Sequence, residues 1–392
     1  MQSIELFAGG GGLALGLHEA GFEPSLVVER DRDSCQTLRE NWVSGLCTKS
    51  LILNRDVRTV EFEKWAGNVD LVSGGPPCQP FSIGGKHKGH ADSRDMFPHA
   101  ANTIRIVRPK AFIFENVRGL LRKSFATYFE YILLQLQHPL ISRKTGEEWW
   151  EHQVRLEQHH TRGREEEFFY RVVFQKINAA DYGVPQCRER VVIVGFRNDI
   201  QQPWSFPPAT HSQGALEGAK WVTGSYWDEH RVPHRERPRL LGADRKRSSE
   251  KYESLPLSLR WRTVRDALRD LPDPRLPEAA RILNHRYQPG AKQYAGHTGS
   301  DLDSPSKTLK AGDHGVPGGE NMLICSDRTV RYFTVRESAR LQTFPDWYVF
   351  PCSWTESMRQ IGNAVPVLLA KIVGNSVSEA LDRHRKRNLS KN

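Results

Sequence analysis

The chain has 392 residues, more than one hydrophobic core usually holds, so we expect two domains. Its formal net charge of +10 favours a polyanionic partner, nucleic acid first and an anionic membrane surface second, although a basic soluble enzyme would carry the same charge. The six cysteines form no CxxC pair and no Cys/His cluster at metal spacing, which indicates a reducing compartment and no zinc or other metal site.

The N-terminal residues predict a nucleotide-binding entry. Residues 3–7 (SIELF) are expected to form a buried strand, which leaves no room for a signal peptide, and no apolar run in the chain approaches membrane-spanning length. The glycines of 9–12 then lead into a helix that Gly21 should cap. Glycines allow close backbone approach and a helix N-terminus offers free N–H groups, so this loop favours a bound cofactor.

Two acids after this loop suit the same cofactor. A second predicted strand, 24–28, ends on Glu29. An acid about 20 residues after a glycine loop is placed to bind ribose hydroxyls, and the alternative is a solvated loop acid. Farther on, Asp56 can accept a hydrogen bond from an adenine amino group, although taken alone it is unremarkable.

Residues 74–82 (GGPPCQPFS) place one thiol, that of Cys78, between prolines that fix φ and stiffen the loop. Residues 69–73 should form a short buried strand, so the thiol lies at a strand end, where α/β sheets carry their chemistry. A thiol that ionises readily there suits nucleophilic attack, and the alternative is a buried structural cysteine. The basic, glycine-rich residues 84–90 can close over a polyanion or form a plain flexible loop.

A second acid also stands at a strand end. A helix is expected over 96–107 and a buried strand over 111–114, so Glu115 should lie on the sheet edge that carries Cys78. A carboxyl group that is shielded from water at such a place can donate a proton.

Two arginines precede the last predicted strand of this half. The sequence does not define the structure of the insertion 122–165, and a strand is expected over 168–177. Arg188 and Arg190 then lead into the strand 191–194. Because they are spaced by two, they should share one strand face and bind phosphate or carbonyl oxygens, unless they form exposed salt bridges.

From about Asn198 the composition shifts to Pro, Gly, Arg and His. The basic segment 231–251 follows three aromatic residues, Trp221, Tyr226 and Trp227. Basic residues beside aromatic ones suit contact with DNA backbone and bases, and the alternative is a solvated surface loop.

The C-terminal part is expected to be helical after a glycine-rich stretch. Short helices are predicted over 263–271 and 335–341, and a longer one opens at 360–366 and runs to about Leu381. The basic tail 383–391 is predicted to be disordered.

Together these motifs resemble the DNA (cytosine-5) methyltransferase family. They occur in the family's order: FAGGGG, the acid Glu29, GGPPCQPFS, ENV at 115–117, Gln186-x-Arg188-x-Arg190, RESARLQTFP and GNAVP. The first, third and last of these are specific. The resemblance covers roughly 1–120, 168–197 and 328–375, and TVRDAL and the Thr308–Leu309 region resemble the family's target recognition domain.

The resemblance implies an α/β fold with two domains. Residues 1–200 and 352–392 would form a Rossmann-like, S-adenosylmethionine-dependent methyltransferase sheet with helices on both faces, and 201–351 a smaller, irregular target recognition domain. The cofactor would contact Phe7, Gly9, Gly11, Gly12, Leu13, Glu29, Arg30, Asp56, Val57, Pro76, Met96, Asn363, Ala364 and Val365. DNA would contact Ser82, Lys86, Arg231, Arg235, Thr308 and Leu309.

Two positions depart from the family's pattern. Arg30 stands where an apolar or aromatic residue often stacks on the adenine, and Asp95 stands where the family often has glycine.

The resemblance also implies methylation of carbon 5 of a cytosine in duplex DNA. Cys78 would add to carbon 6, Glu115 would protonate nitrogen 3, Arg190 would hold the ring carbonyl, and Arg188 would hold the adjacent phosphate or the loop. Stacking in the duplex blocks both faces of the ring, so the base must be flipped out.

Three other functions are weaker. A dinucleotide oxidoreductase would leave Cys78, Glu115 and the GNAVP motif without roles. A cytosine-5 methyltransferase acting on RNA would use the same machinery. The set of Cys78, Glu115 and Arg190 argues against a DNA-binding repressor without activity. The size suits a monomeric bacterial modification enzyme that acts in the cytoplasm on the nucleoid, with a restriction endonuclease for the same site as its potential partner.

Overall fold

The computed structural model describes residues 1–42, 50–77, 95–162, 168–238, 258–293, 298–311, 321–325 and 327–390. Cys78, Ser82 and Lys86 lie outside these described residues. The chain forms two compact units: Met1–Ile177 with Glu189–Phe206 and Ala370–Asn392, and Asn178–Arg188 with Pro207–Leu369. The sequence predicts the domain boundaries at 200 and 351, whereas in these units the GNAVP residues 362–366 belong with the second unit.

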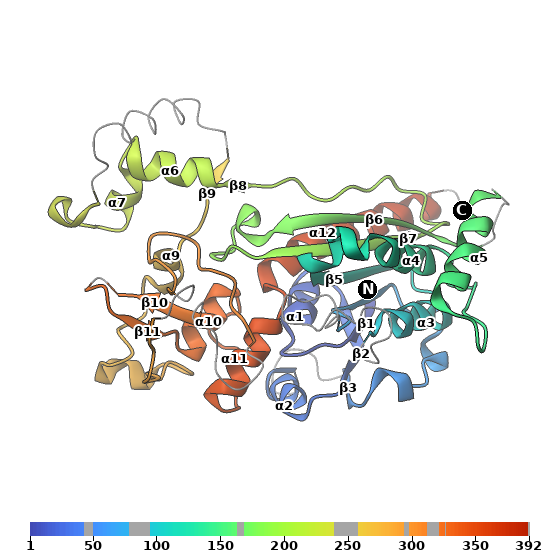
Figure 1. Ribbon diagram of the computed structural model, residues 1–392, viewed down its shortest axis with the longest axis horizontal. Helices are drawn as coiled ribbons and strands as arrows, with labels where there is room; N and C mark the ends of the chain where they lie inside the picture. Colours follow the sequence, from blue (N-terminus) through green and yellow to red (C-terminus); the bar gives the residue numbers. More distant parts are fainter. Residues whose placement is uncertain are drawn as a thin grey trace. The chain divides into compact units, whose positions relative to one another are not determined.

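The first unit is built on a twisted sheet whose described strands follow the order β3-β2-β1-β4-β5-β7-β6 (Figure 1). The neighbouring pairs among β1 to β5 are parallel, and β7 runs antiparallel to β5. The strands are β1 Gln2–Leu6, β2 Glu23–Glu29, β3 Leu51–Asn54, β4 Leu71–Gly74, β5 Ala111–Val117, β6 Tyr170–Asn178 and β7 Glu189–Arg197. The strand order reverses between β1 and β4. In open α/β sheets ligands generally bind outside the carboxyl ends of the strands at such a point.

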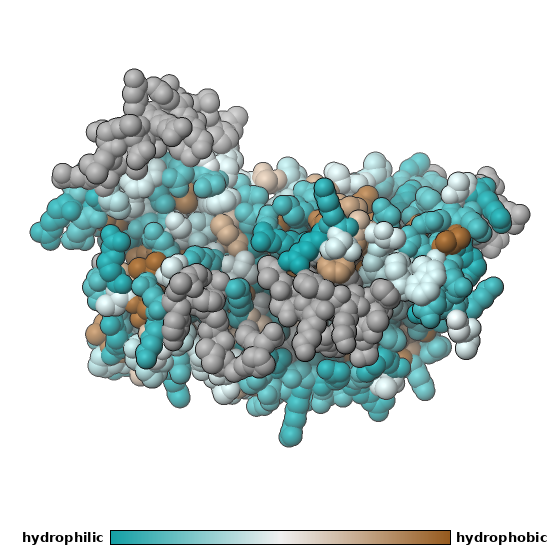
Figure 2. Space-filling model, viewed as in Figure 1, coloured by the Kyte–Doolittle hydropathy of each residue, from teal (hydrophilic) through white to brown (hydrophobic). Residues whose placement is uncertain are grey.

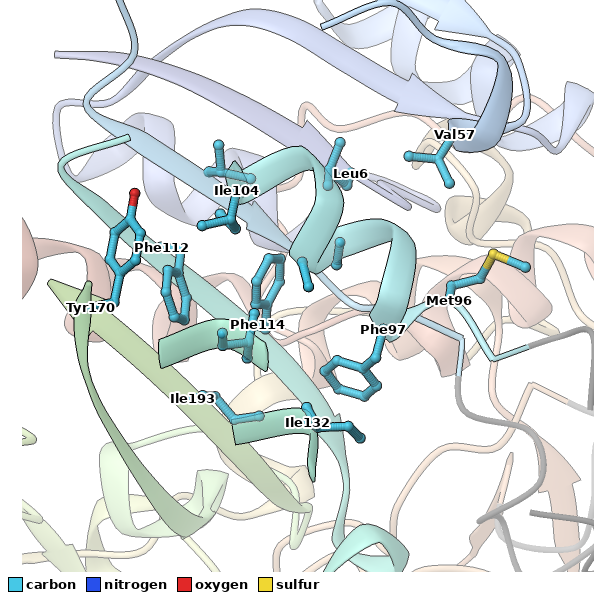
Figure 3. Close-up of a cluster of buried hydrophobic side chains, with 14 of the residues drawn as sticks. Leu6, Val57, Met96, Phe97, Ile104, Phe112, Phe114, Ile132, Tyr170 and Ile193 are labelled. Carbon is cyan, nitrogen blue, oxygen red and sulfur yellow. The ribbon is translucent and has the colours of Figure 1, made fainter. Parts of the chain in front are cut away.

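Helices cover both faces of this Rossmann-like sheet, so the predicted fold class is confirmed. The main hydrophobic core lies on one face of the sheet. Alternate residues of each strand point to this face, since side chains alternate between the two sides of a strand. Figure 3 shows Leu6, Phe112 and Phe114 of the sheet together with Phe97 and Ile104. The helices of this unit are α1 Gly12–Glu19, α2 Arg32–Asn41, α3 Phe97–Val107, α4 Ala126–Gln137, α5 Trp149–Thr161 and most of α12 Val367–Leu389.

The predicted helix from 360 to 381 is wrong in its boundaries. The chain forms α11, Trp354–Asn363, then a break, and then α12, which continues through the tail that was predicted to be disordered. Pro366 lies in the break, and proline is favoured at a helix start rather than inside one. The tail is rich in arginine and lysine, which are good helix formers, and this favours continuation of α12.

Helix α12 packs closely on α1. A Cβ atom added at Gly374 would lie 2.8 Å from Ala20 Cβ and 2.9 Å from Leu17 Cδ2. Among the described residues, Trp354–Leu389 is the one helical segment long and apolar enough to cross a membrane by length and composition, but 61% of its apolar window is buried inside the protein. Burial of this kind is typical of a core helix.

On the face shown in Figure 2, the described surface is mostly hydrophilic, with scattered hydrophobic residues.

The insertion that the sequence left undefined contains α4 and α5. Trp149 at the start of α5 packs edge-on against Tyr128 of α4, with ring centroids 5.2 Å apart. The Tyr131 hydroxyl and His152 Nδ1 form a hydrogen bond of 2.9 Å between the two helices. The described part of the insertion is therefore packed onto the main core.

The second unit has short elements and small hydrophobic clusters. Its helices are α6 Gln213–Trp221, α7 Ser225–Glu229, α9 Val264–Leu268, α10 Val335–Leu341 and α11, and its strand pairs are β8 His211–Ser212 with β9 Leu259–Arg260 and β10 Met322–Ile324 with β11 Val330–Tyr332. Tyr226 and Trp227 are buried in one of the clusters with Leu216. These aromatic residues support the unit's own fold, so the hypothesis that they contact bases is wrong for this structure.

One buried acid does not belong to any predicted site. Glu5 lies in β1 between Ile4 and Leu6, so its side chain points away from the core face that those two residues share. The residue is 2% exposed. The Ser73 hydroxyl of β4 donates a hydrogen bond to its carboxyl group. Burial raises the pKa of Glu5 from its ordinary value of 4.5 to about 8.

We expect Glu5 to make the protein less stable as the pH rises. Between pH 4.5 and about 8 the unfolded chain releases the Glu5 proton while the folded protein keeps it. The free energy of unfolding should therefore fall by about 1.4 kcal/mol per pH unit in this window. Glu5→Gln cannot ionise, so urea unfolding at several pH values should show this slope removed. The exposed Glu61 provides the control Glu61→Gln, which should keep the wild-type slope, and an unchanged slope in Glu5→Gln would contradict the assignment.

Candidate active site

The polar residues that the sequence places at strand ends lie along one edge of the sheet. The glycine loop follows β1, Glu29 ends β2, Asp56 follows β3, and Pro76 follows β4. Glu115 lies inside β5, because this strand is longer than predicted and ends at Val117. Since β1 to β5 are parallel, their carboxyl ends meet at the same edge.

Glu29 holds the glycine loop. Its Oε2 accepts a hydrogen bond of 2.8 Å from the Gly9 N–H, and its Oε1 accepts one of 2.7 Å from the Asp31 N–H. Gly9 and Gly11 have φ angles of 53° and 84°, which glycine adopts without strain, and Phe7 adopts 55°. A Cβ atom added at Gly9 would meet nothing within 4 Å, so the space beside the loop is open. The loop thus combines an open cradle with an acid on the neighbouring strand.

Asp56 is engaged by an arginine that the sequence analysis did not single out. Arg58 donates to both carboxylate oxygens, over 2.9 Å from Nε and 2.6 Å from Nη2. These hydrogen bonds lower the pKa of Asp56 to about 2, so the group is an anion. A carboxylate has about four acceptor sites, so Asp56 keeps capacity for a further donor. Arg30 is largely exposed, and its Nη1 lies 3.8 Å from Asp56 Oδ2.

The other predicted cofactor residues of the first unit are mostly buried. Val57 and Met96 are 6% and 8% exposed and belong to the main hydrophobic core. Figure 3 shows both side chains at one end of this core. Asp95, at the position that departs from the family pattern, is buried and accepts a hydrogen bond from the Tyr128 hydroxyl.

Glu115 and Arg190 form a buried ion pair across two strands. In the antiparallel register Glu115 faces Val192 and Val117 faces Arg190, so Glu115 and Arg190 are diagonal neighbours on the same sheet face. Arg190 Nε lies 2.7 Å from Glu115 Oε1, and the two side chains are 11% and 10% exposed. The two groups therefore form a close ion pair within the sheet. Burial lowers the pKa of Arg190, and the Glu115 carboxylate opposes this effect.

The start of the cysteine loop lies beside Glu115. A Cβ atom added at Gly75 would be 3.5 Å from Glu115 Oε2. One residue farther, the carbonyl oxygen of Pro76 accepts a hydrogen bond of 2.9 Å from Asn116 Nδ2. The side chain of Asn116 therefore fixes the loop beside the acid, a role that sequence reasoning missed although Asn116 is the middle residue of the ENV motif. Cys78 follows two residues after Pro76 and is outside the described residues.

The two arginines that were predicted to share a strand face have different partners. Arg190 lies in β7, whereas Arg188 precedes the strand and belongs to the second unit. The guanidinium group of Arg188 is buried and donates to the carbonyl oxygens of Leu309, Gly362 and Ala364. In this structure Arg188 therefore contacts the backbone of its own unit.

Two of the predicted DNA contacts of the second unit are on the surface. Arg231 and Arg235 are exposed, and Arg235 Nε lies 3.5 Å from Glu236 Oε1. Thr308 Oγ1 donates to the Cys187 carbonyl oxygen over 2.7 Å, and Leu309 is 1% exposed. Leu309 is therefore packed inside the second unit, where DNA could not reach its side chain without a rearrangement.

One cluster among the described residues has ligand atoms at metal-site distances: Glu229, His230 and Asp266. The Arg260 guanidinium already forms ion pairs with both carboxylates, over 2.8 Å to Glu229 and 2.7 Å to Asp266. Because this arginine already occupies both carboxylates, the cluster does not support a metal site.

Three features together define the methyltransferase class. They are a parallel sheet with one antiparallel strand, a glycine loop beside an acid, and a buried acid–arginine pair. Residues 1–139 and 157–379 match the family model "C-5 cytosine-specific DNA methylase". The chain therefore belongs to this family and is a DNA (cytosine-5-)-methyltransferase of the restriction–modification type. The unmatched residues 140–156 fall in the insertion with α5.

Curated relatives extend over nearly the whole chain. The type II methyltransferase M.Eco47II of Escherichia coli is 34% identical over 387 residues, which cover 98% of this chain and 80% of the relative. M.PspPI of a Psychrobacter species is 32% identical over 385 residues, with 97% and 79% coverage. M.NgoMIV of Neisseria gonorrhoeae is 29% identical over 391 residues, with 97% and 98% coverage.

Solved structures share the fold. The S. pombe Dnmt2 methyltransferase aligns with a TM-score of 0.56 at 16% identity and covers 98% of this chain and 99% of its own. The Entamoeba histolytica methyltransferase EhMeth aligns with a TM-score of 0.54 at 13% identity, with 97% and 98% coverage. At these identities the likeness concerns the fold alone.

Proposed function

We propose that the enzyme uses S-adenosylmethionine to methylate carbon 5 of a cytosine that is flipped out of a specific duplex DNA sequence, through a covalent bond to Cys78. The observation that supports this most directly is the buried pair of Glu115 and Arg190 beside Gly75, where the chain enters the cysteine loop. The family model is that of a DNA methylase, so methylation of RNA is not favoured.

The residues of the first unit fit the proposed cofactor. The carboxylate of Glu29 suits the two ribose hydroxyls, the anionic Asp56 suits the adenine amino group, and the open cradle at Gly9 leaves room for the nucleoside. When bound, S-adenosylmethionine supplies an electrophilic methyl group on a sulfonium ion. The proposed contacts in this unit are Phe7, Gly9, Gly11, Gly12, Leu13, Glu29, Arg30, Asp56, Val57, Pro76 and Met96. From the second unit, Asn363, Ala364 and Val365 are also proposed to contact the cofactor.

The chemistry requires a nucleophile, an acid and a cation. Cys78, as a thiolate, forms a bond to carbon 6 of the ring, and Glu115 gives its proton to nitrogen 3, so that carbon 5 becomes nucleophilic. Arg190 holds the ring carbonyl and keeps Glu115 in place. After carbon 5 has gained the methyl group, it loses its proton to a base, the electron pair of that bond expels the Cys78 thiolate from carbon 6, and nitrogen 3 returns its proton to Glu115.

The second unit is proposed to choose the DNA sequence. Arg231 and Arg235 are exposed cations that suit phosphate contact, and Thr308, Ser82 and Lys86 remain proposed contacts. Arg188 is proposed to hold the backbone at Leu309, Gly362 and Ala364 rather than a phosphate. A restriction endonuclease for the same site is the proposed partner in the cell, and we expect the enzyme to act on the bacterial nucleoid as a monomer.

A methyl-transfer assay tests the proposed function. The purified protein should transfer tritiated methyl groups from S-adenosylmethionine to duplex DNA and not to transfer RNA. Bisulfite sequencing of DNA from cells that express the protein should then show one methylated sequence. Transfer to RNA alone, or label at a position other than carbon 5, would contradict the proposal.

We expect Glu29→Ala to weaken cofactor binding by about 1.5–3 kcal/mol, the range for hydrogen bonds to a charged group. The variant loses both the ribose contact and the hydrogen bonds that shape the loop at Gly9 and Asp31. Calorimetry with S-adenosylhomocysteine measures the effect. Glu40→Ala, on the exposed side of α2, is the control and should bind as the wild type does. Unchanged affinity in Glu29→Ala would remove Glu29 from the site.

A further inference from the structure

Arg188 joins two segments that are far apart in the sequence. Its side chain is 1% exposed. Nη1 donates to the Leu309 carbonyl oxygen over 3.3 Å, and Nη2 donates to the carbonyl oxygens of Gly362 and Ala364 over 2.9 Å each. One buried guanidinium group thus holds the segment 308–311 and the turn 362–366 together. All of these residues belong to the second compact unit.

The same two segments touch through their backbones. A Cβ atom added at Gly362 would lie 2.5 Å from Ala311 N and 2.6 Å from Lys310 C. Backbone atoms cannot move aside as a side chain can, so glycine is required at this place. On its other side Lys310 is fixed by Asn321, whose side chain accepts from the Lys310 N–H over 2.9 Å and donates to its carbonyl oxygen over 2.8 Å.

The turn 362–366 is also held from a third side. Gln342 Nε2 donates to the carbonyl oxygens of Ile361 and Ala364 over 2.7 and 3.1 Å. Thr343 Oγ1 accepts the Leu368 N–H over 2.8 Å at the start of α12. Within this fixed turn Asn363 is exposed. The shape in which the turn presents Asn363 therefore depends on residues outside the turn.

We propose that Arg188 is a positioning residue that couples cofactor binding to DNA binding. The proposal rests on the proposed function, which assigns the cofactor to Asn363–Val365 and DNA to Thr308. DNA bound at Thr308 holds residues 308–311 against Arg188, and the same guanidinium group shapes the cofactor turn, so each ligand stabilises the arrangement that the other needs. Coupling of this kind is reciprocal: DNA raises the affinity for the cofactor, and the cofactor raises the affinity for DNA by the same factor. This factor is typically about 5–150-fold.

The experiment compares two buried arginines. Arg336 is fully buried in the same unit and also donates to three carbonyl oxygens, those of Leu283, Pro345 and Tyr348, none of which belongs to the cofactor turn. The donors of lysine sit on a single nitrogen and cannot reproduce the planar fork of the guanidinium group, so Arg188→Lys and Arg336→Lys should both lower the thermal unfolding temperature. Only Arg188→Lys should change cofactor binding.

The measurements are the affinity for S-adenosylhomocysteine, with and without duplex DNA that carries the methylated sequence, and the steady-state constants. For Arg188→Lys we expect the KM for S-adenosylmethionine to rise about tenfold or more, kcat at saturating cofactor to change less, and the effect of DNA on affinity to disappear. Arg336→Lys should keep the wild-type affinity and the wild-type effect of DNA.

Three outcomes would overturn the proposal. The first is a folded Arg188→Lys protein with wild-type affinity and wild-type dependence on DNA. The second is an equal loss in Arg336→Lys, which would show general loosening of the unit. The third is a wild-type protein that does not bind S-adenosylhomocysteine at all, which would refute the proposed function as well. If Arg188→Lys does not fold, Gly362→Ala tests the same junction from the turn. It should lose both cofactor affinity and the effect of DNA on that affinity. A folded Gly362→Ala protein that binds as the wild type does would equally contradict the proposal.

Discussion

Cys78→Ser should abolish methyl transfer, with a loss of about 10⁴-fold or more, because removal of a covalent nucleophile disables the whole reaction. An alkoxide is far harder to form near neutral pH than a thiolate, so serine does not replace the thiol. Cys78→Ala should still bind DNA, since contacts with phosphates supply much of the affinity. Tritium transfer and a gel-shift assay measure the two effects.

Duplex DNA with 5-fluorocytosine at the target tests the covalent bond itself. Fluorine cannot leave carbon 5 as a cation, so elimination should stop after methyl transfer and leave the protein attached to the base. The adduct should survive denaturation and map to Cys78. Cys187→Ser is the matched control and should keep the adduct, because Cys187 contributes its backbone N–H and carbonyl to the contacts with Ser306 and Thr308. A stable adduct in Cys78→Ala, or one that maps to Cys187, would overturn the assignment.

Glu115→Gln should lower kcat by about 10²–10⁴-fold, the usual contribution of a positioned acid. Glutamine has nearly the same shape but cannot deliver a proton to nitrogen 3, and Arg190 Nε can still lie at about the 2.7 Å distance that it keeps from Glu115 Oε1. The variant should still bind S-adenosylhomocysteine as the wild type does, since Glu115 is not among the proposed cofactor contacts. Steady-state kinetics and calorimetry separate the two effects.

The neighbouring acid provides the control for Glu115. Glu189 opens the strand that carries Arg190, and its carboxylate pairs with Arg118 over 2.5 Å and with Lys176 over 2.9 Å at a more exposed place. Surface ion pairs of this kind contribute about 0–1 kcal/mol, so Glu189→Gln should keep its activity. A Glu115→Gln enzyme as active as Glu189→Gln would exclude Glu115 as the proton donor.

The sequence by itself determined the catalytic unit's organisation. Short buried strands, a glycine loop and acids after strands are local signals, and parallel strands bring their carboxyl ends to one edge whatever their order. For this reason the places of Glu29 and Asp56 could be predicted, and Gly21 does adopt a left-handed φ of 91° just after α1. The position of Cys78 remains a prediction from the sequence.

Only the tertiary structure decided which groups meet. Glu115 and Arg190 share a face because β7 pairs antiparallel with β5 in one particular register, and the spacing within a strand does not contain that register. Arg188, two residues away, lies outside β7 and is buried against carbonyl groups that are more than a hundred residues distant in the chain. Tyr226 and Trp227 pack inside the second unit, since an aromatic side chain fills a core as readily as it stacks on a base. Pairing and burial of this kind depend on long-range packing, and a local pattern of residue types leaves them open.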